Sequence, residues 1–186
     1  MKAISFDVDG VLSVWPLGMN PGISPRPKVV APLATNVRRF YKVSERSSRL
    51  GLIAAWLRFA WRRPDPEARE VLRVLSQRRH IVITTGRSVV GQPVLEAWLR
   101  WHGLVDYVKE WHLRPPGLSE RQHKLATLGR LGIDTHVDDD PTTIWYLAEN
   151  GIACPSFREW PKTVSANLPA GVQRVRRLSE LLGLPW

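Results

Sequence analysis

Asp7 and Asp9 stand one residue apart at the end of an apolar run, and Gly10 follows them directly. This pattern predicts a buried strand that ends in two carboxylates and turns at the glycine. Two carboxylates so close together repel each other and are costly to desolvate unless a cation or a bound ligand offsets their charge. We therefore predict a divalent metal site at the carboxyl end of a strand, where open α/β sheets bind ligands. An exposed Asp-x-Asp-Gly turn is the alternative.

A second strand-like run, residues 81–85, ends in hydroxyl groups and continues into Gly86 and Arg87. The hydroxyl of Thr85 and the free N–H groups that follow it can hold phosphate oxygens. An amphipathic helix predicted just before this run would complete a β-α-β unit, so the first two strands should be parallel neighbours, with Thr85 beside Asp7. A threonine that merely ends a strand or caps a helix is the alternative.

Three consecutive aspartates, Asp138, Asp139 and Asp140, end a third strand-like run. Carboxylates at such a position must be solvated, bound to a cation or neutralised by a base. The candidate base is Lys124, which lies on the helix predicted just before this strand. We expect Asp140 to cap the helix that follows rather than to bind a metal.

These polar groups must be positioned by the elements around them. Helices are predicted over residues 67–77, 93–102, 119–131 and 143–150, with a strand or turn over 105–108 and a short strand over 152–154. The tail, residues 172–184, is predicted to be one more amphipathic helix with its apolar side chains inward: Val175, Leu178, Leu181 and Leu182. The alternation of strands and helices predicts an α/β fold, a Rossmann-like three-layer sandwich with a central, mostly parallel sheet.

Residues 13–63 differ in character from the rest of the chain. Residues 13–36 are rich in proline and are predicted to form an extended loop, with a short strand at 28–31. Residues 36–63 alternate apolar, tryptophan and arginine residues without proline, which predicts one or two amphipathic helices. We therefore predict a core domain of residues 1–12 and 64–186 and a small, mainly helical insertion of residues 13–63. The insertion could cover the active site, dock on the core, or contact a partner or an anionic membrane through residues 37–63. For the tryptophans in helical runs (Trp56, Trp61, Trp98 and Trp101), packing is the default expectation.

The composition limits the environment and the ligands. With 186 residues, of which 44% are hydrophobic, the chain can bury a real core. A net charge of +10 will attract polyanions, such as phosphorylated substrates, nucleic acid or an acidic membrane surface, unless it reflects only a solvated basic surface. The single cysteine, Cys154, excludes an intramolecular disulfide and fits a reducing compartment. Because Lys2 leads directly into the first strand and no apolar run is long enough to cross a bilayer, we expect a cytoplasmic protein without a signal peptide or transmembrane segment.

Taken together, these segments resemble the four motifs of the haloacid dehalogenase superfamily of phosphohydrolases. Residues 7–12 match the first motif, 81–86 the second, Lys124 the third and 137–139 the fourth. The resemblance covers residues 1–12 and 64–155, so residues 13–63 would correspond to the small cap that such enzymes carry. Nothing within that cap indicates a substrate.

The resemblance implies a catalytic role for four residues. Asp7 would be the nucleophile that forms an aspartyl-phosphate, and Asp9 would protonate the leaving oxygen and then activate water. Thr85 and Lys124 would bind the phosphoryl oxygens. Members that cleave carbon–halogen bonds lack an acid at the position of Asp9, so a phosphatase is the expected activity. Mutases of the superfamily keep both aspartates, so mutase activity is an alternative, although the small cap does not favour it.

The resemblance also implies a Mg²⁺ cofactor. Its ligands would be Asp7, Asp139 and the backbone carbonyl of Asp9, while Asp138 would act through a water or as a supporting residue.

The substrate stays open between two classes. Residues 111–115, with Lys124 and the acidic strand, are similar to the phosphatase domains of polynucleotide kinase 3′-phosphatases and to some 5′-nucleotidases, which would bring Arg114 to a phosphate or nucleotide. Gly86 and Arg87 are further substrate-binding candidates. An aspartate expected after the Arg-Pro pair is missing, because residues 117–120 stand there. A small phosphorylated metabolite is equally open. A different class of function is a regulatory module that binds a membrane or partner through residues 37–63.

Overall fold

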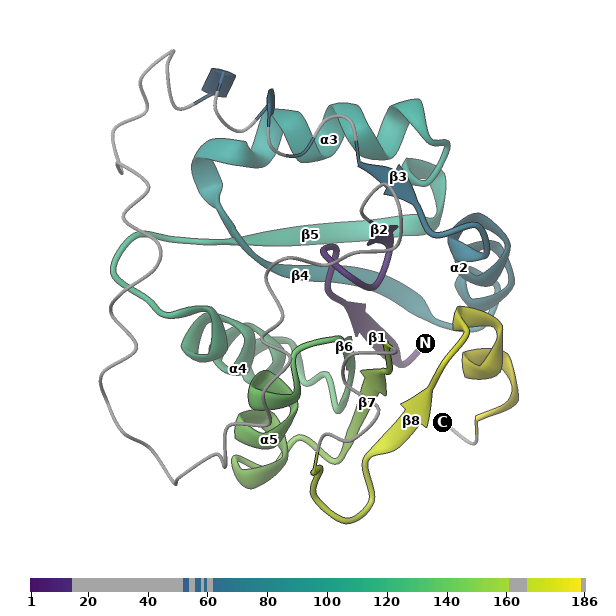
Figure 1. Ribbon diagram of the computed structural model, residues 1–186, viewed down its shortest axis with the longest axis vertical. Helices are drawn as coiled ribbons and strands as arrows, with labels where there is room; N and C mark the ends of the chain where they lie inside the picture. The colour runs from purple at the N-terminus through teal and green to yellow at the C-terminus, as the bar shows by residue number, and fades with distance from the viewer. Residues whose placement is uncertain (15–51, 54–55, 58, 60–61, 161–166, 185–186) are drawn as a thin grey trace.

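The computed structural model describes residues 1–14, 52–53, 56–57, 59, 62–160 and 167–184. Six parallel strands form one sheet in the order β5-β4-β1-β6-β7-β8 (Figure 1). The strands are β1 (Ala3–Phe6), β4 (His80–Ser88), β5 (Val108–Arg114), β6 (Thr135–Asp138), β7 (Cys154–Arg158) and β8 (Gln173–Val175). The three strands that carry the predicted chemistry, β4, β1 and β6, are adjacent at the centre of the sheet.

Helices cover both faces of the sheet. One face carries α2 (Ala68–Ser76), α3 (Gln92–Trp101) and the 3₁₀ helix Leu178–Gly183, and the other carries α4 (Glu120–Leu131) and α5 (Pro141–Glu149) (Figure 1). Two shorter 3₁₀ helices, Val89–Gly91 and Val105–Tyr107, connect strands and helices. This arrangement confirms the predicted three-layer α/β sandwich, and the ambiguous segment 105–108 is a 3₁₀ turn that enters β5.

The alternation of side chains along the central strands separates an apolar face from a partly polar one. Ile4 and Phe6 of β1 belong to the larger hydrophobic cluster, with α2, α3 and the C-terminal 3₁₀ helix. On the opposite face Ser5 is fully buried, and its hydroxyl donates to Thr84 Oγ1 at 2.9 Å. His136 of β6 lies beside them, with its Nδ1 3.0 Å from the Ser5 hydroxyl. A buried polar layer therefore runs across β4, β1 and β6 toward α4.

The structure corrects the predicted C-terminal helix. Residues 173–175 form strand β8, parallel to β7, and only Leu178–Gly183 are helical, as a 3₁₀ helix. Arg174 and Arg176, two residues apart as on one face of a strand, both reach the carboxylate of Glu159. Of the apolar side chains predicted to face inward, Val175, Leu178 and Leu181 are buried, whereas Leu182 is 37% exposed. The predicted strand 152–154 was also placed too early and was not the last one, since β7 spans Cys154–Arg158.

The predicted insertion is described only at its ends. Strand β2 (Ser13–Val14) pairs antiparallel with β3 (Arg63–Pro64), which places residues 13 and 64 side by side. The predicted strand at 28–31 and nearly all of the predicted helices over 36–63 lie outside the described residues. Of the tryptophans expected to pack, Trp98 is buried, but Trp101 is 74% and Trp56 is 44% exposed; Trp61 is outside the described residues. Among the residues described, no helix has both the length and the apolar character needed to span a bilayer.

Candidate active site

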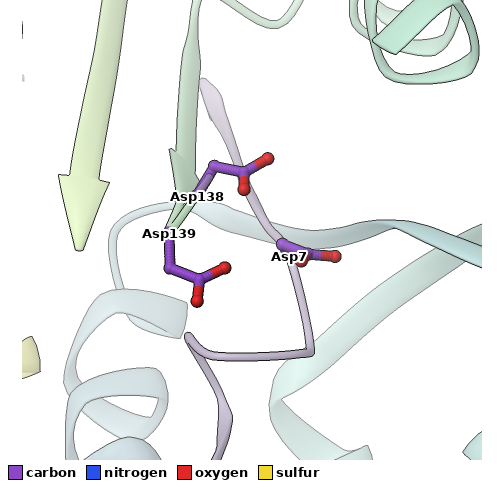
Figure 2. A group of neighbouring side chains, drawn as sticks. All are labelled: Asp7, Asp138 and Asp139. Atoms are coloured by element: carbon purple, nitrogen blue, oxygen red, sulfur yellow. The ribbon is translucent and has the colours of Figure 1, made fainter. Parts of the chain in front are cut away.

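Asp7, Asp138 and Asp139 meet at the carboxyl ends of β1 and β6 (Figure 2). Phe6 pairs with Val137 in the parallel register, and the N–H of Asp7 donates to the Val137 carbonyl at 2.9 Å, so the two strands end side by side. One carboxylate oxygen from each aspartate lies within 4.8 Å of the others, and all three side chains are buried. The structure thus brings together three of the predicted metal-site residues.

The electrostatics of this cluster fit a divalent cation. Asp7 Oδ1 is buried and accepts no hydrogen bond from any residue that the structure describes. Burial, together with the neighbouring carboxylates, raises the pKa of Asp7 and of Asp139 well above the usual value for an aspartate, although the charge of Lys124 opposes this. A cation would relieve the repulsion between these buried carboxylates, and carboxylate oxygens are the hard ligands that Mg²⁺ prefers.

The turn at Gly10 gives the cluster its space. Gly10 has a φ of 85°, which residues with a side chain rarely adopt, and a Cβ atom at this position would overlap the Asp139 carboxylate. The carbonyl of Gly10 accepts a hydrogen bond from Trp160 Nε1 at 3.0 Å, which holds the turn against the end of β7. Glycine is therefore required here for two separate reasons.

Lys124 lies within the acidic cluster. The capping box between Ser119 and Gln122 fixes the start of α4, and one turn later the fully buried side chain of Lys124 points at the sheet edge. Its Nζ lies 2.7 Å from Asp138 Oδ2 and 3.5 Å from Asp7 Oδ2. Burial alone would lower the pKa of Lys124, but the surrounding carboxylates raise it well above the usual lysine value. Lys124 is therefore a buried, permanently charged ammonium group.

Both carboxylate oxygens of Asp138 contact other groups of the protein. Oδ2 faces both Lys124 and His136 Nε2, the latter at 3.1 Å, and Oδ1 accepts the N–H of Asp140 at 3.0 Å. Burial would raise the pKa of Asp138, but Lys124 and His136 outweigh it and hold the pKa well below the usual value. These contacts suit a role in orienting Lys124 more than a role as a direct metal ligand. Asp140 accepts the Thr142 N–H at 2.9 Å and so caps α5 as predicted.

Asp9 points toward two arginines rather than toward the acidic cluster. Arg87 donates through Nε and Nη2 to the two Asp9 oxygens at 2.8 and 2.6 Å, and Arg62 Nη1 contacts Oδ1 as well. Burial would raise the pKa of Asp9, but these charges and hydrogen bonds outweigh it and lower the pKa to about 2. The side chain of Asp9 therefore lies apart from the three-aspartate group, although its backbone stays beside Asp7.

Arg62 is the residue that the sequence analysis missed. Its carbonyl accepts a hydrogen bond from the buried Trp98 Nε1 at 2.7 Å, and its guanidinium lies over the Phe59 ring at 5.2 Å. The guanidinium of Arg87 lies over the same ring at 4.2 Å. Nothing local distinguishes Arg62 from the other arginines of its segment. Its place just before Arg63, where the chain returns to the core, is the only sequence signal that could have identified it.

The remaining predicted residues lie on β4, which continues through Gly86 to Ser88 and does not end at Thr85 as predicted, and at the end of β5. Thr85 is buried, and its hydroxyl accepts the Arg87 N–H at 3.4 Å. Arg114, predicted to approach the substrate, donates through Nε to the Gly86 carbonyl at 3.1 Å and through Nη1 to the Leu118 carbonyl at 2.8 Å. Arg114 thus joins the end of β4 to the loop that precedes α4.

Comparison with known proteins gives structural neighbours only. No protein-family model and no curated protein matches the chain. A haloacid dehalogenase-like hydrolase from Streptococcus pneumoniae has a TM-score of 0.63 at 14% identity, over 98% of this chain and 97% of its own. A protein described as a predicted phosphatase from Clostridium acetobutylicum has a TM-score of 0.62 at 17% identity, over 98% and 99%. A haloacid dehalogenase-type hydrolase from Bacillus subtilis, solved bound to magnesium, has a TM-score of 0.50 at 15% identity, over 65% and 55%.

Proposed function

The chain has the haloacid dehalogenase-like fold, as the sequence resemblance implied, and from this fold and the site at its sheet edge we propose that it is a Mg²⁺-dependent phosphatase. It would hydrolyse a phosphate monoester through an aspartyl-phosphate intermediate. The observation that carries the proposal is the Asp7 carboxylate, which has one oxygen without a partner among the described residues and the other 3.5 Å from the buried ammonium of Lys124. A nucleophile beside a fixed positive charge suits attack on an anionic phosphoryl group.

Asp7 and Asp139 are the side chains that would hold Mg²⁺, together with the backbone carbonyl of Asp9. When bound, the ion would neutralise the carboxylates and polarise the phosphoryl oxygens. The magnesium-bound neighbour from Bacillus subtilis is consistent with this choice of metal.

In the proposed reaction Asp7 attacks phosphorus and the bond to the leaving oxygen breaks. The N–H groups after Thr85, its hydroxyl and Lys124 would hold the phosphoryl oxygens during the transfer. Water then attacks the aspartyl-phosphate, Asp9 accepts its proton, and inorganic phosphate leaves with Asp7 regenerated.

The arginine pair makes Asp9 better suited to the second step than to the first. Arg87 and Arg62 hold its pKa at about 2 against the raising effect of burial, so Asp9 is a carboxylate at neutral pH, which is the form that can accept a proton. To protonate a leaving group it would first have to gain a proton. Phosphate esters whose leaving group needs little protonation, such as aryl esters, should therefore react faster than alkyl esters.

The test is hydrolysis of p-nitrophenyl phosphate with Mg²⁺ and with EDTA, by the wild type, Asp7→Asn and a control, Asp106→Asn, which changes an exposed aspartate. We expect Mg²⁺-dependent turnover that Asp7→Asn abolishes and Asp106→Asn leaves intact. Equal rates in the wild type and Asp7→Asn would refute the mechanism. Phosphometabolites, nucleotides and 3′-phosphorylated oligonucleotides, tested in parallel, distinguish the substrate classes; the net charge of +10 favours including the polyanions.

A second candidate function, contact with an anionic membrane through residues 37–63, is favoured by one observation. The described apolar residues Ile53, Trp56 and Leu57 of this segment are 54%, 44% and 72% exposed. Co-sedimentation with phosphatidylserine vesicles that Trp56→Ser reduces would support this function. Absence of binding at low salt would argue against it.

A further inference from the structure

Glu120, the first residue of α4, places its carboxylate among the groups proposed to bind phosphate. Its Oε1 lies 2.6 Å from Lys124 Nζ. The same carboxylate lies so close to Gly86 that a Cβ atom on that glycine would overlap it. Gly86 follows Thr85, so Glu120 occupies the space between Lys124 and the Thr85–Gly86 backbone.

Three contacts fix the segment that carries Glu120. Ser119 caps α4, and Arg114 donates both to the Gly86 carbonyl and to the Leu118 carbonyl, which holds the loop before α4 against the end of β4. The absence of a side chain on Gly86 then leaves room for the Glu120 carboxylate. The position of Glu120 is therefore determined by the fold and not by the ion pair alone.

Glu120 is the carboxylate of this cluster that can leave at the lowest cost. Lys124 contacts three carboxylates, and the side chains of Asp7 and Asp138 are only 5% and 1% exposed. The side chain of Glu120 is 41% exposed, so it can rotate into solvent and be hydrated. Asp138 is also held by His136, and Asp7 is buried, so neither carboxylate can be hydrated where it lies. An incoming anion would therefore displace Glu120 first.

We propose that Glu120 is an exchangeable internal anion at the phosphate subsite, and that a bound phosphoryl group must displace its carboxylate from Lys124. The proposal rests on the phosphatase function proposed above. Glu120 would weaken the binding of phosphate and of substrate without taking part in bond breaking, so it would set the affinity of the phosphate subsite and would not be a catalytic residue.

The direct test is inorganic phosphate binding, measured by calorimetry with Mg²⁺ present. We compare the wild type with Glu120→Gln, which removes the charge, with Glu120→Asp, which shortens the reach to Lys124, and with Glu149→Gln, a control at an exposed glutamate. Glu120→Gln should bind phosphate about fivefold more tightly, the factor that corresponds to the ~1 kcal/mol of a partly exposed ion pair. The KM for p-nitrophenyl phosphate should fall by a similar factor while kcat changes little, and Glu149→Gln should match the wild type.

The outcomes separate this inference from the proposed function. If Glu120→Gln and Glu120→Asp, both folded by circular dichroism, bind phosphate no more tightly than the wild type while turnover still depends on Asp7, then Glu120 does not compete for the subsite and the phosphatase proposal stands. Weaker binding in both variants would show that Glu120 orients Lys124, which also overturns the inference. If no variant binds phosphate and none hydrolyses p-nitrophenyl phosphate, both proposals fail.

Discussion

Replacing Lys124 by methionine tests the charge balance of the whole site. The Lys124 side chain is fully buried, with its Nζ 2.7 Å from Asp138, 2.6 Å from Glu120 and 3.5 Å from Asp7. Methionine keeps much of the volume and removes the charge, which leaves buried carboxylates facing one another. Breaking a buried ion pair from one side typically costs about 3–5 kcal/mol.

Most of this cost should come from two of the three partners. Glu120 can turn into solvent, so its share is at most about 1 kcal/mol. Asp138 and Asp7 are buried and would be left without a hydrating solvent, so they account for the remainder, about 2–4 kcal/mol. Since a domain is stable by only about 5–15 kcal/mol in total, the variant should be severely weakened but measurable.

The assay is urea unfolding at pH 7.5 for the wild type, Lys124→Met, the double variant Lys124→Met/Asp138→Asn, and Lys109→Met as a control at an exposed lysine. Removing the Asp138 charge should recover about half of the loss, because the uncompensated charge is then gone. Mg²⁺ should stabilise Lys124→Met more than the wild type, since the cation no longer competes with an ammonium group. A loss below about 1 kcal/mol in Lys124→Met, with an unchanged urea dependence, would refute the reasoning.

Three further predictions concern the residues around this cluster. Gly10→Ala and Gly117→Ala both place alanine at a positive φ (85° and 84°), which costs about 1–2 kcal/mol of stability, but only the alanine at residue 10 also overlaps the Asp139 carboxylate. Gly10→Ala should therefore lose more stability in urea unfolding and should bind Mg²⁺ more weakly in calorimetry. Equal losses of stability and unchanged Mg²⁺ binding would contradict the packing described for Gly10. Arg62→Gln should let the pKa of Asp9 rise from about 2, which moves the acidic limb of the pH profile of kcat/KM to higher pH. A profile that stays in place would mean that Asp9 is not the base or that Arg87 alone sets its pKa. Burial lowers the pKa of His123 below 6.5, so the folded state favours the neutral imidazole. The contribution of His123 to the free energy of unfolding is therefore complete above pH 6.5 and is lost as the pH falls below 6.5, by up to ~1.4 kcal/mol per pH unit. His123→Gln should flatten this dependence in urea unfolding, and an unchanged slope would contradict it.

The parts of the fold that the sequence predicted are those that depend on local pattern. Strands β1, β4 and β6 are apolar runs that end in polar groups, and the capping box at Ser119 and the cap at Asp140 are short-range signals. The parallel pairing of β1 with β4 followed from the helix between them, because such crossovers join parallel strands. From these local rules alone, Asp7, Thr85 and Lys124 are predicted to lie near one edge of the sheet.

The tail was mispredicted because its pattern is ambiguous. Leu178 and Leu181 are three residues apart, a spacing that suits an α-helix and a 3₁₀ helix alike. What makes residues 173–175 a strand is pairing with β7 and the contacts of Arg174 and Arg176 with Glu159, and both depend on residues far away along the chain. Periodicity within one segment contains no information about such partners.

The same limit explains why Arg62 and Glu120 escaped notice. An acidic residue in the first turn of a helix is explained by the helix dipole alone, and an arginine among many arginines is explained by solvation. Their roles arise only from proximity, Arg62 to Asp9 and Glu120 to Lys124 and Gly86. For Arg114 a local motif predicted contact with the substrate, and its contacts with the carbonyls of Gly86 and Leu118 also depend on proximity that the motif did not reveal.

The charges around the sheet edge divide the site into two halves. In one half Lys124 contacts the carboxylates of Asp7, Asp138 and Glu120, and Asp139 lies beside Asp7 and Asp138, so negative charge is in excess among these groups. In the other half Arg62 and Arg87 both contact the carboxylate of Asp9, so positive charge is in excess among these three described groups. Among these eight described groups, with each one ionised, five carboxylates against three bases leave two negative charges, which is the charge that one divalent cation offsets. A cation beside Asp7 and Asp139 would therefore also free Lys124 and the arginines to attract an anion, so the binding of metal and of phosphate should reinforce each other.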